Sequence, residues 1–341
     1  MARRRRSAVV SRLCLEAEKE GRCIVASNRA EAKSLRRGCA SGLLLSPFPQ
    51  LYALADSWNE LKPEVQGLRI LRGLQNLHPA WVFAGPSAAL ALGLSVPRRY
   101  LKPVRVVTTS KAHSRSLPHV FRQCVDDDEV VSAGGVQATS LARTTFDCLR
   151  EMDMPDGLAV ADSLLKNYSV SQETLLERMQ SFSRQCAGWE HAIETALLAD
   201  GRADNGGESI ARGRMIRLGY EPPDLQVELL NVVEGGAYYG DFGWTLADGT
   251  QIIGELDGKD KYVDPTMTHG KPIEQVMREE RLRESRIGAT GVRVMRFSYA
   301  DMMDDQQFCK ILNAYGVPRA TRRYYAGVGE PYKPAGLSAS D

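Results

Sequence analysis

The sequence lacks a long hydrophobic run, a cysteine motif and an internal repeat. No apolar stretch reaches the roughly 20 residues of a membrane-spanning helix, and the opening MARRRRSAVVSRL has no apolar core like that of a signal peptide. The 7 cysteines form no CxxC pair and no Cys/His group at zinc spacing. No period of about 20 to 50 residues recurs, which excludes a solenoid. We therefore expect a cytoplasmic protein with reduced thiols and no membrane contact.

The net charge is also small. The chain has 44 Lys and Arg against 42 Asp and Glu, which gives +2 and argues against a uniformly basic nucleic-acid-binding surface. With 43% hydrophobic and 25% charged residues, the composition excludes a disordered or fibrous protein. A length of 341 residues leaves room for two or three domains, each with its own core.

The N-terminal region combines two helix patterns with a pair of short strands. SAVVSRLCLEAEKEG predicts a first helix, and SNRAEAKSLRRG predicts a second helix that begins at Ser27 or Asn28 and ends at Gly38. LLLSPFPQLYAL then predicts a two-stranded ribbon. This order is typical of a winged-helix DNA-binding domain.

The second predicted helix is strongly basic. It carries Arg29, Lys33, Arg36 and Arg37, which places positive charge where a recognition helix needs it, so we expect these residues to bind nucleic acid. The alternative is a solvated basic face on a small helical domain.

The remaining chain divides at changes in composition. The Gly, Asn and Asp residues of DGRADNGGES mark the clearest boundary, and the order after it is helix, three strands, a long polar helix, a strand and a helix. The fold class we expect is α+β or α/β. The parts are a winged helix (1–60), a mixed α/β domain (61–170), a helical connector (171–205), a restriction-endonuclease-like domain (206–316) and a flexible tail (317–341).

Acidic residues gather on two strands of the fourth part. The turn LADGT predicts an antiparallel hairpin that has Asp241 on its first strand and Glu255 and Asp257 near the end of its second. Glu255 and Asp257 are two residues apart and therefore share one face of the sheet. Glu208, on the preceding helix, could add a fourth carboxylate. Because converging carboxylates repel one another, a divalent cation such as Mg²⁺ or Mn²⁺ is their natural partner.

Two lysines follow these acids. Lys259 or Lys261 could orient a metal-bound water or stabilise charge on a scissile phosphate. The alternative is an exposed strand end whose charges pair with each other. The apolar flanks in YYGDFGW and IIG favour the first interpretation, because they place Asp241 among residues that should be buried.

The C-terminal half carries a series of motifs that are individually weak. GGES, PPDLQVE, YGDFGW, GELDGKDKY, REERLRESRI and VRVMRFSYADM follow one another between Gly206 and Met302. Together they resemble the Vsr-like branch of the PD-(D/E)XK nuclease superfamily. The resemblance implies that Asp241 and Glu255 are the family's two acids, that Asp257 is the acid of its Glu-x-Asp-Gly signature and that Glu208 is its helix glutamate. A strict Glu-x-Lys would need lysine at position 257, so the lysine role passes to Lys259 or Lys261.

The N-terminal half resembles another family. AEAKSLRRGCASGLLL, WVFAGPSAALALGL and GGVQATSLARTTFDCLREMDMPDGLAVADSLL are similar to the AbiEi-type antitoxins of abortive-infection systems. This resemblance implies a winged helix that binds DNA, and it leaves open whether a toxin partner exists.

These observations support two main hypotheses. The first is a metal-dependent DNA endonuclease targeted by a winged helix, in a phage-defence or toxin–antitoxin setting. The second is a non-catalytic, antitoxin-like DNA-binding regulator whose nuclease-type domain is degenerate. A purely structural interaction module is a third alternative, which gives the acids no role.

The first hypothesis assigns roles to three sets of residues. The catalytic residues are Asp241, Glu255 and Lys259, and the ligands of Mg²⁺ or Mn²⁺ are Glu208, Asp241, Glu255 and Asp257. The DNA-binding residues are Arg29, Lys33, Arg36, Arg37 and Lys261.

Overall fold

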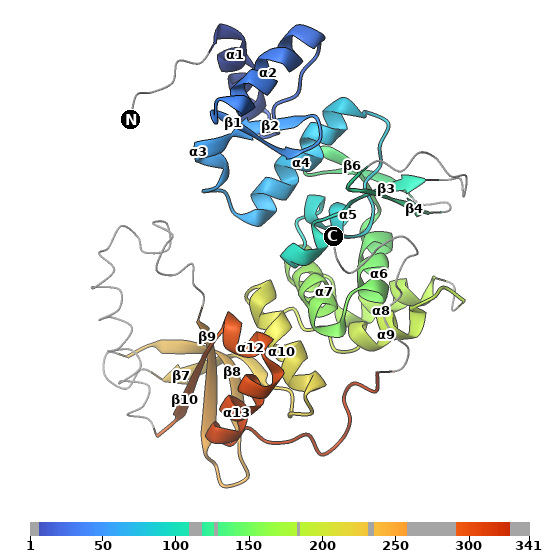
Figure 1. The fold of residues 1–341 in the computed structure, drawn as a ribbon. Helices are drawn as coiled ribbons and strands as arrows, with labels where there is room; N and C mark the ends of the chain where they lie inside the picture. The colour runs from blue at the N-terminus through green and yellow to red at the C-terminus, as the bar shows by residue number, and fades with distance from the viewer. Residues whose placement is uncertain are drawn as a thin grey trace. The chain divides into compact units, whose positions relative to one another are not determined.

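The computed structural model describes residues 7–108, 118–125, 129–182, 185–230, 235–257 and 291–327. The chain forms two compact units, of which the first comprises 1–151 with 332–341 and the second comprises 152–331 (Figure 1). Both units contain helices and small sheets, which confirms a mixed α and β protein. None of the helices in these ranges has the length and apolar character needed to cross a bilayer. The winged-helix and nuclease-like assignments stay predictions.

The first unit begins with the two predicted helices and the predicted ribbon. Its described elements are α1 (Ala8–Lys19), α2 (Arg29–Ala40), β1 (Leu44–Phe48), β2 (Leu51–Leu54), α3 (Ala55–Trp58), α4 (Pro63–Leu77), α5 (Gly85–Ala91), the short 3-10 helix η1 (Arg98–Tyr100), β3 (Val104–Thr108), β4 (Val120–Cys124), β5 (Val130–Ala133), β6 (Val136–Thr139) and α6 (Leu141–Glu151). Asn28 caps α2 by accepting from the Glu31 amide. The sequence predicted that α2 ends at Gly38, but the helix continues to Ala40. Gly38 lies inside the helix, where a Cβ would come within 2.7 Å of Leu44, so it serves close packing against β1.

A small apolar core joins these first elements. Leu13 of α1, Leu35 of α2 and Leu44 of β1 are buried together, and β1 pairs antiparallel with β2. Further along, Phe83 is fully buried and forms bridges to both Val106 of β3 and Ala138 of β6. It therefore links the parallel pair β3–β4 to the antiparallel pair β5–β6.

The second unit is built around one four-stranded sheet. Its described elements are α7 (Met154–Tyr168), α8 (Gln172–Gln180), α9 (Trp189–Ala196), α10 (Gly206–Arg217), β7 (Asp224–Leu230), β8 (Ala237–Thr245), β9 (Gln251–Asp257), β10 (Arg293–Ser298), α12 (Tyr299–Met303) and α13 (Asp305–Tyr315). The strand order is β10-β9-β8-β7. The predicted hairpin is confirmed, because β8 and β9 are antiparallel with Phe242 opposite Gly254. β10 pairs parallel with β9.

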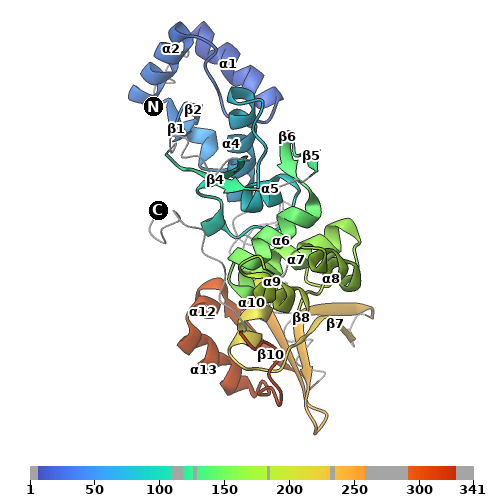
Figure 2. The same ribbon diagram turned by 90° about the vertical axis from the view of Figure 1, so that its right-hand side faces the viewer.

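Three helices pack against one face of this sheet. The core contains Met215 of α10, Met302 of α12 and Phe308 of α13 together with Phe242 and Phe297 of the strands. Figure 2 shows α12 and α13 on one side of the sheet. The core fixes α10 against the sheet, with its first turn close to the end of β9, where a Cβ on Gly207 would lie 3.3 Å from Leu256.

Helix α7 belongs to the second unit, although the sequence placed it in the mixed domain that ends at residue 170. It packs closely along α10. A Cβ on Gly213 of α10 would lie 2.6 Å from the Cα of Pro155, so only glycine permits this approach. The unit boundary therefore lies after α6, because the strongest packing partner of α7 comes later in the chain.

The beginning of the expected tail packs on the second unit. Val317 is buried, and the guanidinium of Arg319 lies over the ring of Tyr220, with 3.8 Å between guanidinium carbon and ring centroid. The Tyr324 hydroxyl donates to the carboxylate of Glu221. Residues 317–327 are thus part of the packed unit, and the rest of the expected tail lies outside the described residues.

Candidate functional site

Two of the expected acids, Glu208 and Asp241, interact where the first turn of α10 meets the central strands β8 and β9. Glu208 is only 3% exposed, and both of its carboxylate oxygens are held by short hydrogen bonds. Oε2 accepts from the Asp204 amide at 2.7 Å, and Oε1 accepts from the Asn205 side-chain amide at 2.6 Å. Asn205 also caps α10, so the residue that starts the helix also orients its glutamate.

Gln226 is a site residue that the sequence interpretation missed. It lies on β7 opposite Asp241 by strand register and has a left-handed backbone with φ of 53°. Its side-chain nitrogen donates to Glu208 Oε2 at 3.0 Å. A non-glycine residue with positive φ inside a strand is costly, and such strain concentrates at functional sites. The motif LQVELL gives no signal of it.

Asp241 lies at the end of the β8–β9 ladder. Its Oδ2 accepts from the backbone amide of Leu256 at 2.8 Å, so a side chain replaces a backbone acceptor at this point of the hairpin. Asp241 is half-buried and its neighbour Phe242 is fully buried, which agrees in part with the burial expected from YYGDFGW. The hydrogen bond brings Asp241 to the residue that follows Glu255.

Glu255 is buried, with 4% of its surface exposed. Arg296, which lies opposite it on β10, donates from Nη2 to Glu255 Oε2 at 2.8 Å. This ion pair compensates the charge of Glu255 inside the protein. It differs from the alternative interpretation, which expected an exposed strand end whose charges pair with each other. Arg296 lies between the buried Met295 and Phe297, so it is on the other face of β10 from them. The irregular spacing of the two arginines in VRVMRFS did not identify it as a partner of Glu255.

Glu208 and Asp241 interact through their charges. Burial, and next the negative charge of Asp241, raise the pKa of Glu208 from 4.5 to about 7, against the opposing hydrogen bond from the Asp204 amide. Near neutral pH Glu208 therefore passes from its protonated to its charged form, and the charged form is disfavoured by burial and by the charge of Asp241. A cation would compensate these charges.

The expected divalent cation fits these two carboxylates by the chemistry of their donor atoms. Mg²⁺ prefers oxygen ligands and accepts sites with one or two carboxylates when it keeps several waters. Within the described ranges, no group of three or more His, Cys, Asp or Glu is arranged to hold a metal, so the full expected set of four acids is not assembled there. Asp257 is half-buried at the end of β9, and Lys259 and Lys261 lie outside the described residues.

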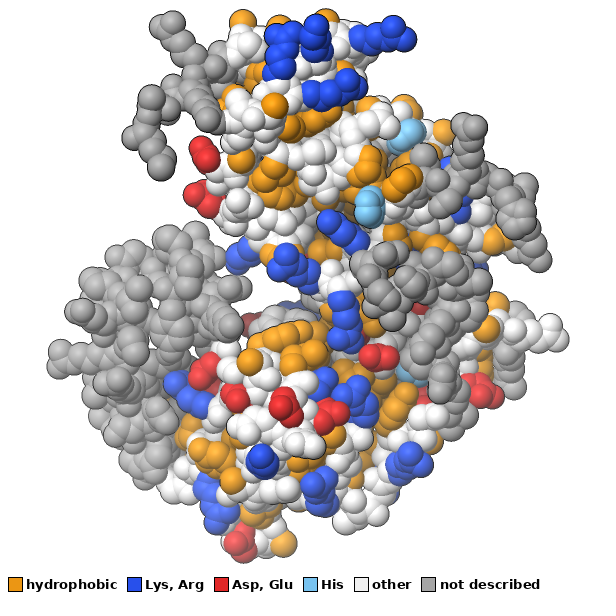
Figure 3. Space-filling model, viewed as in Figure 1, with side chains coloured by type: hydrophobic (Ala, Val, Ile, Leu, Met, Phe, Trp, Pro, Cys, Tyr) orange, Lys and Arg blue, Asp and Glu red, His pale blue; other side chains and the backbone are white. Residues whose placement is uncertain are grey.

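The expected DNA-binding residues form one cationic stripe. Arg29, Lys33, Arg36 and Arg37 are all exposed on α2, at the end of the first unit where blue side chains gather in Figure 3. In the described part of the chain, no acid lies within ion-pair distance of any of them. The acid of this helix, Glu31, is buried and accepts from the amide of Ser27 at 2.8 Å and from Arg12 at 2.5 Å.

Comparisons of this chain with protein-family models, with curated proteins and with solved structures give no match.

Proposed function

We propose that the protein is a DNA-binding, divalent-metal-dependent endonuclease-type protein. The observation that carries this proposal is the Glu208–Asp241 pair, because burial and the charge of Asp241 raise the pKa of Glu208 to about 7, and a bound cation would compensate the two carboxylates. The α2 stripe supplies the complementary surface for a polyanion.

The roles follow from the contacts. Glu208 and Asp241 would hold the ion, and the hydrogen bonds of Asp204, Asn205 and Leu256 fix the direction of their oxygens. Bound Mg²⁺ supplies a water of lowered pKa and stabilises charge on a phosphate. Glu255 keeps a fixed position through its ion pair with Arg296.

The order of elements in the second unit supports the same proposal. One helix, three antiparallel strands and a fourth strand parallel to the third put Asp241 and Glu255 on the two central strands and Glu208 on the helix that packs against the sheet. This agrees with the order of motifs on which the resemblance to PD-(D/E)XK nucleases rests.

Plasmid nicking and linearisation with Mg²⁺ or Mn²⁺ tests the proposal. We expect metal-dependent cleavage that Glu255→Gln abolishes and Lys259→Ala slows strongly, whereas Lys261→Ala mainly weakens DNA binding. Asp248→Asn is the matched control, because it removes a carboxylate from the far turn of the same hairpin and asparagine can still accept from the Thr250 amide, as Asp248 does at 2.9 Å. Cleavage by Glu255→Gln at the parent rate would reveal a contaminating nuclease and refute the assignment.

A second candidate function is DNA binding without catalysis. The Glu255–Arg296 ion pair favours it, because it neutralises an acid that a nuclease would use. A parent protein that binds DNA with a steep salt dependence, yet cleaves neither duplex nor single-stranded DNA with either metal, would establish this alternative. A toxin partner stays a prediction from the N-terminal resemblance.

A further inference from the structure

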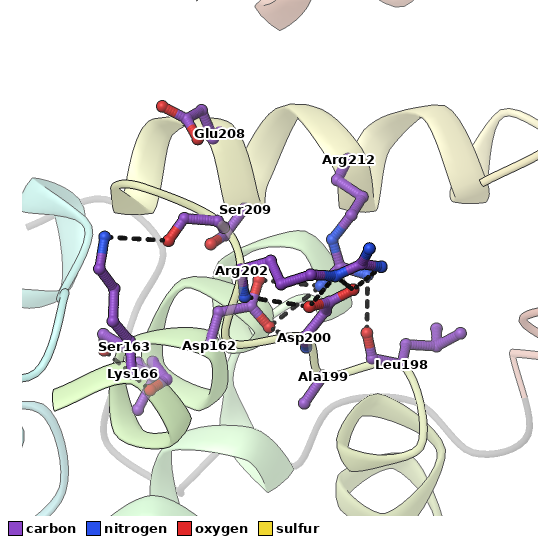
Figure 4. A network of polar contacts seen from close by, with 12 residues as sticks. Asp162, Ser163, Lys166, Leu198, Ala199, Asp200, Arg202, Glu208, Ser209 and Arg212 are labelled. Atoms are coloured by element: carbon purple, nitrogen blue, oxygen red, sulfur yellow. Dashed lines mark hydrogen bonds and ion pairs between the residues drawn. The ribbon is translucent and has the colours of Figure 1, made fainter. Parts of the chain in front are cut away.

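A buried ion pair joins α7 to α10 beneath the candidate site. Arg212 of α10 donates from Nη2 to both carboxylate oxygens of Asp162 at 2.8 and 3.0 Å, and both side chains are almost fully buried. Figure 4 shows Arg212 reaching from α10 to Asp162, while Glu208 points away from it. The pair thereby fixes the rotation of α10 about its own axis.

The same aspartate holds the loop that precedes α10. The Asp200 amide donates to Asp162 Oδ1 at 2.7 Å, and Arg212 donates from Nη1 to the Leu198 carbonyl at 2.7 Å. The loop passes close to α7 at Gly201, where a Cβ would lie 2.9 Å from the Cβ of Leu165. The loop is therefore attached to both helices.

Lys166 lies one turn after Asp162 on α7 and holds the end of this loop. Its ammonium donates to the Asp204 carbonyl at 2.9 Å and to the Asp204 carboxylate at 2.6 Å. The amide of the same Asp204 donates to Glu208 Oε2. Lys166 thus holds the carboxylate and carbonyl of Asp204, and the amide of Asp204 holds Glu208.

We propose that Lys166 is a positioning residue for Glu208, so that α7 sets the metal affinity of a site that it does not touch. This inference rests on the proposed function, in which Glu208 binds the divalent cation. Without Lys166, the exposed carboxylate and carbonyl of Asp204 lose the ammonium group that holds them, and the loop can turn its amide away from Glu208. Residues that orient metal ligands typically change metal affinity by about 10- to 100-fold, and the part exposure of Lys166 places its effect near the lower end, at about 5- to 10-fold.

Mn²⁺ binding to the full-length protein tests this inference, with free ion counted by electron paramagnetic resonance up to millimolar concentration. We expect Lys166→Met to weaken binding by about 5- to 10-fold and Lys166→Arg, which keeps a cationic donor, to restore most of it. In a Glu208→Gln background, Lys166→Met should have no additional effect, because its route to the ion has been removed. Arg202→Met is the control, since it removes an exposed ion pair of the same loop that is not bonded to Asp204.

The Mn²⁺ titrations distinguish a failure of the positioning role of Lys166 from a failure of the proposed function. Unchanged Mn²⁺ affinity in Lys166→Met, or an equal loss in the parent and Glu208→Gln backgrounds, overturns the positioning role and leaves the proposed function standing. A parent that does not bind Mn²⁺ refutes both. Thermal unfolding of each variant separates a local loss of affinity from a loss of folded protein.

Discussion

Asp241→Asn should change how the stability of the protein depends on pH. Glu208 has a pKa of about 7 in the folded chain against 4.5 ordinarily, through burial first and the charge of Asp241 second. Between these values the folded chain binds more protons than the unfolded chain, so protonation favours folding. The stabilisation is fully present below 4.5 and is lost as the pH rises to about 7. At roughly 1.4 kcal/mol per pKa unit, this loss amounts to about 3 kcal/mol.

Asparagine removes the charge of Asp241 and keeps an oxygen that can accept from the Leu256 amide. Burial is the larger cause of the raised pKa of Glu208, and the charge of Asp241 is the smaller one. Removing that charge should therefore restore the smaller part of the lost folding free energy, on the order of 1 kcal/mol at pH 8 and almost nothing at pH 4. The expected result is a variant more stable than its parent at pH 8 and equal to it at pH 4.

The assay is urea denaturation from pH 4 to pH 8 in EDTA, with the difference between parent and variant taken at each pH. Titrating groups other than Glu208 and Asp241 are common to both proteins and cancel in this difference. Asp248→Asn serves again as the control, and its difference from the parent should not change between pH 5 and pH 8. An Asp241→Asn protein that is less stable than its parent at pH 8 would refute the reasoning, because Asp241 would then be a satisfied anion of the fold.

Three other perturbations test the remaining contacts. Charge reversal of Arg36 and Arg37 to Glu in the full-length protein should weaken DNA binding and reduce the slope of log affinity against log salt from about −4 to about −2; an unchanged slope would mean that α2 does not face DNA. Gly213→Ala should destabilise the second unit by about 1 to 3 kcal/mol in chemical denaturation, because its Cβ meets the backbone of α7; full stability would contradict the close helix packing. Asp162→Asn should cost about 3 kcal/mol or more in the same assay, since it leaves the buried charge of Arg212 uncompensated, and a neutral effect would show that water reaches the pair.

The local elements could be predicted from the sequence because their causes are local. Asn28 caps α2 through an amide three residues away, and the turn LADGT determines the β8–β9 hairpin and its register. Alternation along β9 then places Glu255 and Asp257 on one face. The positions of the acids on helix and strands were therefore accessible without a structure.

The surroundings of those acids depended on the tertiary structure. Glu255 meets Arg296, 41 residues later, and Glu208 meets Gln226, whose unusual backbone has no counterpart in the hydrophobic pattern. Periodicity specifies which side of an element is apolar, but it does not specify which polar side chain another element brings to a buried charge.

The same limit explains the division of the chain. The Gly- and Asp-rich segment before α10 predicts a boundary by composition, yet Asp162 and Lys166 of α7 hold that segment by hydrogen bonds and ion pairs across about 40 residues. The sequence by itself determined the helices, the hairpin and the stripe of cations on α2. Only the tertiary structure decided that α7 joins the sheet unit and that Glu208 is buried with a raised pKa beside Asp241, because burial and charge compensation depend on residues that are distant in the chain.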